Sequence, residues 1–516
     1  MKNSGSRILL FFLAVTLIVC GGCAPVTNYS QADGPEREVP EQLAAQPDIE
    51  DPGERVSYRV SGCFSDHMVL QRDAVIQVWG WSDDKGAVIY GEFMGEKRYA
   101  VVDEEGAWLI QFSPKTYATE GQTLSIYPKN GRRTEFTDVL VGDVWFVVGQ
   151  SNAEYYFSST LTLFPELREE VDENDNIRLY REDKGDAYDR DQRGVKGPQK
   201  DVASSFYEWK KTKLSEVLGF SSLGYLFVKE ISKKVDVPQG IIMATAGGCM
   251  LQDFMPEETA AQFETLDSAW SVGAIYNFLI APFTNMAIRG MVFYQGESDE
   301  TWYEVYPEKL RAFVAALREN FNCDFAFYNV QLSSHGTLQA AWPNLPGLRA
   351  AQTEAYYMIP HSYLICSMDV GWRAENPEED PAHPYDKWTI AKRLAAVALC
   401  QEYGLEAYKL DYVSSPIPSK ITWKEDSILV DFSNTGDGLQ SRAEKLTGFR
   451  VINEEGFSFV AEAEIVDRDT VKVSFDQSNI NGISYGYTHS ALPAEASLAN
   501  SADVPAVTFR MFREVK

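Results

Sequence analysis

Histidine is scarce in this sequence, with only five in 516 residues. The five cysteines after residue 23 show no CxxC or Cys/His spacing of the kind that binds metals. We therefore expect neither a metal ion nor a cofactor. Because five is an odd number and three of these cysteines lie in apolar stretches, we predict buried thiols rather than a disulfide framework. The five are Cys63, Cys249, Cys323, Cys366 and Cys400.

Basic residues are also few. The chain has 47 Lys and Arg against 75 Asp and Glu, which gives a formal net charge of −28. Binding to nucleic acid requires a basic surface, so a nucleic-acid partner is not expected. The hydrophobic content of 45% and aromatic content of 13% are typical of a folded globular protein.

Only one long apolar run occurs, at residues 9–19, and it is too short to span a membrane comfortably. Lys2 and Arg7 precede it, and Cys20-Gly-Gly-Cys23 follows it. This arrangement resembles a bacterial lipoprotein signal, with 1–22 as the signal peptide and Cys23 as the lipidated residue. We therefore expect an extracytoplasmic protein held at the cell envelope by a lipid anchor. Ordinary secretion remains open, because Cys20 stands where such signals usually carry Leu.

The rest of the chain divides by composition into four parts. Residues 23–55 are rich in Pro, Ala, Gln, Asp and Glu and predict a flexible tether. Short alternating runs between turn residues predict a β-sandwich domain at 56–138. Strands alternating with helices predict an α/β domain at 139–410, and a return to β patterns predicts a second β domain at 411–516.

Five apolar runs in the α/β domain predict parallel strands, at residues 144–148, 240–245, 290–294, 325–331 and 363–368. Helical stretches at 223–234, 306–321 and 387–403 separate or follow them, so the expected sheet is covered on both sides. A polar insertion at about 157–215 is predicted to fold over or beside the functional edge, and whether it forms a lid stays open.

Four of these strands end in polar or glycine-rich motifs. The motifs are Gly149-Gln-Ser-Asn152, Ala246-Gly-Gly-Cys249, Gln295-Gly-Glu-Ser-Asp299 and Asp369-Val-Gly371. Each motif alone is typical of an ordinary turn. In an open parallel sheet, however, ligands bind at the carboxyl ends of the strands, where all four motifs converge. We therefore predict a functional site there, with Ser151 on a tight strand-end turn as a candidate nucleophile.

A serine nucleophile requires a base, and histidine suits that role at neutral pH. His383 has a carboxylate, Asp380, three residues before it in a proline-bounded loop at the expected edge. His67 and His489 lie in the β domains, His361 opens the fifth strand at the opposite edge, and His335 is a possible substrate contact. We therefore predict a Ser151–His383–Asp380 triad, with Asp369 as a competing third member.

A tetrahedral intermediate also requires hydrogen-bond donors for its oxyanion. The backbone N–H groups of Ser151 and Gly248 are candidates, because glycine permits close approach. Gln295 or Asn152 can add a side-chain amide, and Glu297 is assigned to the same pocket. Tyr155, Tyr156 and Trp372 are candidate sugar-facing aromatics, although aromatic residues near strand ends commonly belong to the core.

The motifs together resemble the sialate O-acetylesterase family, carbohydrate esterases of the SGNH hydrolase group. The resemblance rests on stretches that cover nearly all of the chain after the tether: 64–72, 78–81, 149–152, 287–298, 348–352, 380–384 and 508–510. It implies a three-layer α/β/α fold of SGNH type flanked by two smaller β domains. It also implies that Ser151, His383 and Asp380 carry out the chemistry and that Gly248 and Gln295 line the oxyanion site.

The resemblance implies a serine esterase that removes O-acetyl groups from carbohydrate, most directly from sialic acid. The chain departs from the family pattern at Ala153, Ala246 and Trp372, near the expected pocket, which leaves the particular sugar open. One alternative is a deacetylase for xylan or another polysaccharide. A second alternative, of another class, is a non-catalytic glycan-binding lipoprotein. The acetyl position and the oligomeric state are not predicted.

Overall fold

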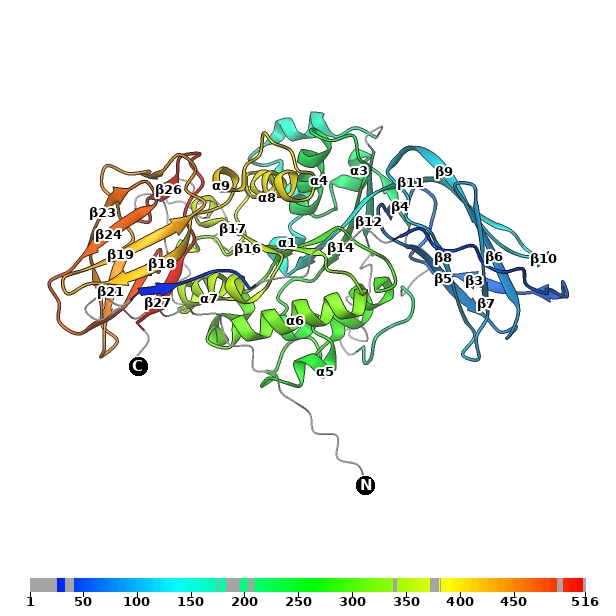
Figure 1. Ribbon diagram of the computed structural model, residues 1–516, viewed down its shortest axis with the longest axis horizontal. Coiled ribbons are helices and arrows are strands. Elements are labelled where there is room, and N and C mark those ends of the chain that lie inside the picture. The colour runs from blue at the N-terminus through cyan, green and yellow to red at the C-terminus, as the bar shows by residue number, and fades with distance from the viewer. Residues whose placement is uncertain are drawn as a thin grey trace, which may run out of the picture.

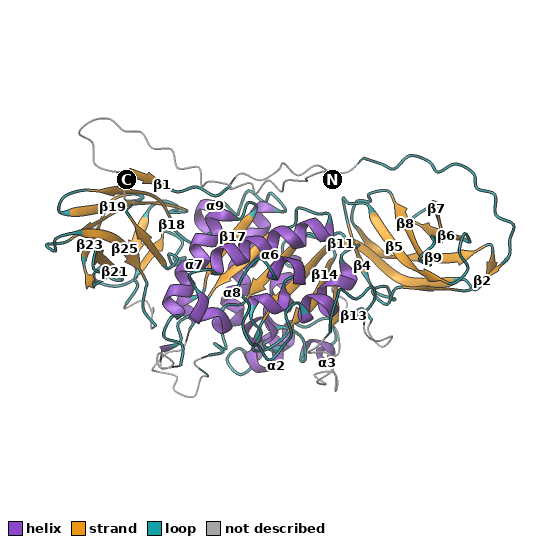
Figure 2. Ribbon diagram, turned by 90° about the horizontal axis from the view of Figure 1, so that it is seen from below, coloured by secondary structure: helices purple, strands orange, loops and turns teal. Residues whose placement is uncertain are grey.

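The computed structural model describes residues 26–32, 41–173, 176–181, 195–202, 208–336, 341–371, 380, 382–489 and 495–513. The predicted signal peptide 1–22 and Cys23 lie outside these ranges. Within them, no helix is both long and apolar enough to cross a membrane. A central region of helices and strands lies between β-sheet regions at both ends of the molecule (Figures 1 and 2).

The central sheet has the strand order β13-β12-β14-β11-β15-β16-β17, and every neighbouring pair from β12 to β17 is parallel. Its strands are β11 (Thr134–Gly149), β12 (Ile177–Arg181), β13 (Lys210–Lys211), β14 (Gln239–Thr245), β15 (Gly290–Tyr294), β16 (Ala326–Gln331) and β17 (Ser362–Cys366). All five predicted parallel strands are confirmed. Their apolar runs form strands because both faces of the sheet are covered, so alternation is unnecessary.

Two pairs of helices pack near this sheet. Helix α4 (Ser222–Ser232) packs against α8 (Lys387–Gln401), and α6 (Tyr306–Phe321) packs against α7 (Leu345–Met358). In Figure 1 the first pair lies above the central strands and the second pair below them. The three predicted helices correspond to α4, α6 and α8. The shorter helical segments are α1 (Ser151–Glu154), α2 (Phe157–Thr160), α3 (Leu214–Val217), α5 (Glu257–Ala260), α9 (Leu410–Val413), η1 (Pro165–Glu170), η4 (Leu251–Phe254), η5 (Tyr276–Ile280), η6 (Ala281–Phe283), η7 (Glu297–Trp302) and η9 (Met368–Val370).

The stretch 157–215, predicted as an insertion that interrupts the strand–helix pattern and folds over or beside the functional edge, also contributes strands to the sheet. Strand β12 lies within it and pairs in parallel with β14, and β13 extends the sheet edge. Because Arg178 is charged, β12 does not form a continuous apolar run in the sequence. The Arg178 side chain is nonetheless buried, because its guanidinium donates to the carboxylate of Asp138 at 3.3 Å and to the Ile177 carbonyl at 3.0 Å.

The N-terminal sheets consist of β strands between residues 55 and 141. Strands β3, β5 and β8 form one antiparallel sheet, whereas β4, β6, β7 and β9 connect to β11. The strands are β2 (Arg55–Val56), β3 (Tyr58–Val60), β4 (Val69–Gln71), β5 (Ile76–Ser82), β6 (Val88–Phe93), β7 (Glu96–Val101), β8 (Ala107–Phe112), β9 (Ala118–Pro128) and β10 (Asn130–Gly131). The predicted boundary between 138 and 139 falls inside β11, which pairs with β9 in its first half and with β14 and β15 in its second.

The C-terminal sheets consist of the strands that follow α9, together with β1 from the N-terminal segment. One has the order β1-β18-β19-β24-β23, another has the order β22-β21-β25-β27, and β20 pairs with β26. The strands are β1 (Val26–Asn28), β18 (Ile417–Trp423), β19 (Ser427–Ser433), β20 (Leu439–Ser441), β21 (Phe449–Asn453), β22 (Ser458–Val460), β23 (Glu462–Asp467), β24 (Thr470–Ser474), β25 (Ile480–Tyr485), β26 (Leu498–Asn500) and β27 (Phe509–Phe512).

Part of the predicted flexible tether is packed against these sheets instead. Strand β1 is the edge strand beside β18, and the Gln31 amide donates to the Ile359 and Ser362 carbonyls at 2.8 and 2.9 Å. Farther along, the guanidinium of Arg98 binds the Leu43 carbonyl at 3.1 Å. These contacts use backbone groups and amides, so a composition poor in apolar residues does not reveal them.

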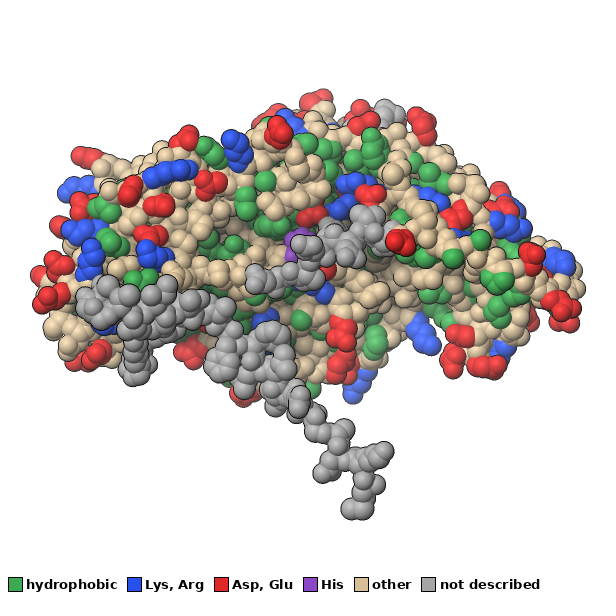
Figure 3. Space-filling model, in the orientation of Figure 1, with side chains coloured by type: hydrophobic (Ala, Val, Ile, Leu, Met, Phe, Trp, Pro, Cys, Tyr) green, Lys and Arg blue, Asp and Glu red, His purple; other side chains and the backbone are tan. Residues whose placement is uncertain are grey.

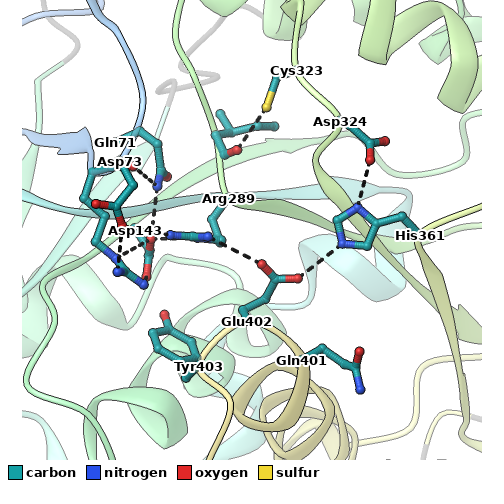
Figure 4. Close-up of polar contacts among 12 residues, drawn as sticks. Gln71, Asp73, Asp143, Arg289, Cys323, Asp324, His361, Gln401, Glu402 and Tyr403 are labelled. Atoms are coloured by element: carbon teal, nitrogen blue, oxygen red, sulfur yellow. Dashed lines mark hydrogen bonds and ion pairs between the residues drawn. The ribbon is translucent and has the colours of Figure 1, made fainter. Parts of the chain in front are cut away.

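The edge of the central sheet where the strands begin carries a buried ionic network (Figure 4). Asp143 is fully buried and accepts hydrogen bonds from Arg72 at 3.0 Å and Arg289 at 2.8 Å. His361 lies between Asp324 and Glu402, at 3.3 and 3.4 Å. Burial lowers the pKa of His361, but the two carboxylates outweigh it and raise the pKa overall. As predicted, His361 lies at the edge opposite the strand-end motifs.

Candidate functional site

The turn that carries Ser151 is set by Gly149, the last residue of β11. Gly149 has φ +141°, and a β-carbon there would collide with the carbonyl oxygen of Tyr294 in β15. Only glycine therefore permits this close approach of the two strands at this backbone angle. The chain turns through Gln150 into α1, so Ser151 is the first residue of a short helix at the carboxyl end of the strand.

Ser151, His383 and Asp380 form a chain of hydrogen bonds. The Nε2 atom of His383 lies 2.8 Å from Ser151 Oγ, and its Nδ1 atom lies 2.6 Å from Asp380 Oδ2. Burial alone would raise the pKa of Asp380, but its hydrogen bond with His383 lowers that pKa overall. The structure thus brings together three predicted residues, the first two of which lie 232 positions apart in the sequence.

Asp369, the competing third member, has other partners. It is buried at the start of the segment after β17, and its two carboxylate oxygens lie 2.7 Å from the Arg393 guanidinium. Arg442 donates to it at 2.8 Å. Burial would raise the pKa of Asp369, but the two arginines lower it to about 2. The geometry therefore favours Asp380 as the partner of His383.

The glycine pair after β14 lies beside the serine. A β-carbon on Gly247 would lie 3.7 Å from the Ser151 β-carbon, and the exposed Gly248 adopts φ +71°. The Ser151 N–H belongs to the first turn of a helix, where backbone donors have no partner one turn earlier. The glycine pair therefore lies beside Ser151, whose own N–H has no partner within the helix.

The side chain of Asn152 does not face the substrate side. Asn152 is 1% exposed, and its Nδ2 atom donates to Glu297 Oε1 at 2.5 Å and to the Ala382 carbonyl at 2.9 Å. Both amide hydrogens have protein acceptors, so they are not available to an oxyanion. Glu297 is itself buried, and burial raises its pKa.

Gln295 is fully buried as well. Its Nε2 atom donates to Asp299 at 2.5 Å and to the Cys249 carbonyl at 3.2 Å, and its Oε1 atom accepts a hydrogen bond from Tyr306. Burial raises the pKa of Asp299 to about 6. The Gln295 amide therefore supports the strand-end loops from behind and does not reach the pocket.

Comparison with known proteins connects this geometry to one group of enzymes. The model of the carbohydrate esterase, sialic acid-specific acetylesterase family matches residues 141–383. The sialate O-acetylesterases of Pongo abelii and Homo sapiens are each 24% identical over 406 residues, covering 71% of this chain and 74% of theirs. The crystal structure of a carbohydrate acetylesterase from Xanthomonas citri has a TM-score of 0.75 and 24% identity, covering 88% of this chain and 99% of that one.

This chain is a carboxylic ester hydrolase related to the sialate O-acetylesterases. The predicted resemblance is confirmed, and the alternative of a protein that only binds glycans is not supported. The solved structure supports the α/β fold with its additional β sheets. Over the part of the esterase that the structure describes, no group of three His, Cys, Asp or Glu side chains could hold a metal ion.

Lys387 lies beside the predicted site but was not predicted from the sequence. Lys387 is fully buried at the start of α8, and its Nζ atom lies 2.7 Å from Asn152 Oδ1 and 2.8 Å from the Pro384 carbonyl. A signal was present: Lys387, Ile390, Ala391 and Leu394 follow helical spacing on the buried face of α8. A lysine on an otherwise apolar helix face is rarely buried without a specific partner.

The remaining predicted residues differ in their placement. His335 is fully buried, its Nδ1 atom bonds the Ser333 carbonyl at 2.8 Å, and burial lowers its pKa to about 3, so the predicted substrate contact is wrong. The ring of Tyr155 stacks on His383 with centroids 6.3 Å apart. Tyr156 is 37% exposed, and Trp372 lies outside the described residues.

Figure 3 shows one face of the molecule, in the orientation of Figure 1. Acidic and basic side chains are interspersed on the face drawn, and the described part of that face carries no continuous basic patch. Charge on this face is therefore mixed.

Proposed function

We propose that this esterase removes O-acetyl groups from sialic acid by a serine mechanism. The observation that carries the mechanism is the hydrogen-bond chain from Ser151 through His383 to Asp380, with distances of 2.8 and 2.6 Å. Those distances suit proton transfer between hydroxyl and imidazole. The sugar is proposed from the relatives, which are named sialate O-acetylesterases.

In the proposed reaction, Ser151 Oγ attacks the acetyl carbonyl while His383 Nε2 accepts the serine proton. Asp380 holds the imidazole through Nδ1 and stabilises its protonated form. The backbone N–H groups of Ser151 and Gly248 bind the oxyanion. The carbon–oxygen bond to the sugar then breaks, and the sugar oxygen takes the proton from His383. Water, deprotonated by His383, hydrolyses the acetyl-serine to acetate and restores the hydroxyl.

Acetate release from an acetylated sugar tests the mechanism. We expect Ser151→Ala to lower kcat by about 10⁴-fold or more, because no nucleophile remains. Ser158→Ala, which changes an exposed serine in the neighbouring helix α2, is the matched control and should retain kcat. Activity that persists in Ser151→Ala would remove Ser151 from the mechanism.

The sugar is tested separately. We expect faster acetate release from O-acetylated sialic acid than from acetylated xylan at equal concentrations of acetyl groups. The reverse order would replace sialic acid with a plant polysaccharide as the proposed substrate and leave the serine mechanism intact.

We also propose the finer features of the fold and location that the family resemblance implies. The central domain takes the three-layer SGNH form, supported by the two helix pairs beside the parallel sheet. The mature chain is attached to the cell envelope by lipid on Cys23, supported by the signal-like segment before it. Labelled fatty acid should enter the protein in a bacterial host and be lost in Cys23→Ser. Equal labelling of both proteins would contradict the anchor.

A further inference from the structure

The two peptide carbonyls that flank His383 are both held by buried side chains. Asn152 Nδ2 donates to the carbonyl of Ala382 at 2.9 Å, and Lys387 Nζ donates to the carbonyl of Pro384 at 2.8 Å. The backbone on each side of the histidine therefore has a fixed hydrogen-bond donor. A histidine in a loop, with its side chain 30% exposed, would otherwise have more freedom to move relative to the serine.

The two donors are joined to each other. Lys387 Nζ lies 2.7 Å from Asn152 Oδ1, and the Asn152 amide lies 2.5 Å from Glu297 Oε1. Asn152 directly follows Ser151 in α1. The turn that carries the serine and the loop that carries the histidine are thus connected twice, directly by the bond from Asn152 to the Ala382 carbonyl and indirectly through Lys387, which binds both Asn152 and the Pro384 carbonyl.

Burial makes these contacts strong. Lys387, Asn152 and Glu297 are 0%, 1% and 3% exposed. Hydrogen bonds from a charged donor are roughly twice as strong as neutral ones, and losing one in a dry site leaves its partner unsatisfied. The Lys387 ammonium also lies 4.8 Å from the centre of the Tyr155 ring, the ring that stacks on His383.

Helix α8 holds the backbone of Lys387 in a fixed position. Lys387 is its first residue, and the Asp386 carboxylate caps the helix by accepting the Thr389 N–H at 2.9 Å. The helix packs against α4. The ammonium group is therefore held in place by a packed helix, whereas the histidine loop has no regular structure at residues 382–384.

We propose that Lys387 is a positioning residue that fixes the His383 imidazole relative to Ser151 through Asn152 and the Pro384 carbonyl. The proposal rests on the proposed function, since it requires His383 to be the base. Lys387 does not touch the reacting atoms. Its contribution is the geometry of proton transfer, where a displacement of about 1 Å can cost on the order of 10²-fold in rate.

The first variant for the test is Lys387→Met, which keeps the length of the side chain and removes the ammonium. With an aryl acetate as substrate, we expect kcat to fall about 10²-fold while KM changes less than about twofold. The matched control is Lys229→Met, which removes a different buried lysine, one that lies in α4. We expect the control to keep kcat, whatever its effect on stability. A kcat in Lys387→Met within twofold of the unmodified protein would overturn the proposal.

A double variant separates positioning from general damage. If Lys387 acts through His383, adding Lys387→Met to His383→Ala should not lower the residual rate further. An equal fall in both backgrounds would show a merely structural role and overturn the proposal. Lys387→Gln carries the same test if Lys387→Met does not fold. A His383→Ala protein that keeps full activity would instead contradict the proposed function, which is a distinguishable result.

Discussion

Asp380 and Asp369 follow the same strand in sequence, and their surroundings separate their roles. The Asp380 side chain is 46% exposed and bonds His383, whereas the Asp369 side chain is 8% exposed and bonds Arg393 and Arg442. A half-exposed carboxylate can orient an imidazole at a smaller desolvation cost than a fully buried one. A buried carboxylate that is paired with two arginines has a structural role.

Replacing each aspartate by asparagine tests this separation. We expect Asp380→Asn to lower kcat by about 10²- to 10⁴-fold, because the imidazole loses its orientation and the charge that stabilises its protonated form. Asp369→Asn should keep kcat in the fraction that remains folded. Steady-state kinetics on an aryl acetate, with the folded fraction measured by gel filtration, checks both variants. A larger fall in kcat for Asp369→Asn than for Asp380→Asn would make Asp369 the third member of the triad.

Spacing in the sequence is sufficient to predict the three proposed catalytic residues but not the roles of the amides. Ser151 and His383 could be selected because strand ends and a nearby carboxylate are local patterns. Gln295 and Asn152 were predicted to face the oxyanion, yet both are buried with protein acceptors. Asn152 points toward Glu297 and Ala382, which lie 145 and 230 positions away. Gln295 has nearer partners, Asp299 and Cys249, but its burial depends on how the strand-end loops pack, which one sequence cannot reveal.

Among the elements, β11 and its turn set the position of the serine. The strand stops at Gly149 because the backbone there takes φ +141° and lies against Tyr294. The five parallel strands could be predicted from apolar runs, since both faces of each strand are buried. Strand β12 could not, because its Arg178 is neutralised by Asp138, a residue 40 positions earlier.

Gly149→Ala should therefore destabilise the fold strongly. The substitution adds a methyl group that collides with the Tyr294 carbonyl, and it also imposes an unfavourable backbone angle. We expect a loss of more than about 3 kcal/mol in the free energy of unfolding. Gly95→Ala is the matched control, because Gly95 has φ +79° with open space around it. It should cost only about 1 to 2 kcal/mol. Equal losses in urea unfolding would show that the collision is relieved.

At the scale of the whole molecule, Asp369 connects two regions. It follows β17 in the central sheet, Arg393 belongs to α8, and Arg442 follows β20 in the C-terminal sheets. The packed part of the N-terminal segment adds a second link, since β1 pairs with β18 while Gln31 binds residues before and in β17. Neither link follows a local pattern, so neither was predicted.

The connection through Asp369 should depend on pH. Its pKa in the folded protein is lowered to about 2 from an ordinary value of 3.8. The Asp369 carboxylate therefore contributes about 2 kcal/mol to the free energy of unfolding. This contribution is fully present above about pH 4 and is lost as the pH falls toward 2. We expect the difference in Tm between the unmodified protein and Asp369→Asn to be large at pH 6 and to shrink toward pH 2. Asp426→Asn, at an exposed position, is the control. A difference that stays constant with pH would contradict this assignment.

Strand β11 leaves no place for a hinge between the N-terminal sheets and the esterase core. Its backbone is paired with β9 and β4 before residue 143 and with β14 and β15 after it, and one hydrophobic core continues across both regions. Rotation of one region relative to the other would break the hydrogen bonds that β11 makes to the strands on both sides of residue 143. Movement of the N-terminal sheets relative to the core is therefore not available to open or close the site, and force applied to these sheets should be transmitted through β11 directly to the serine turn.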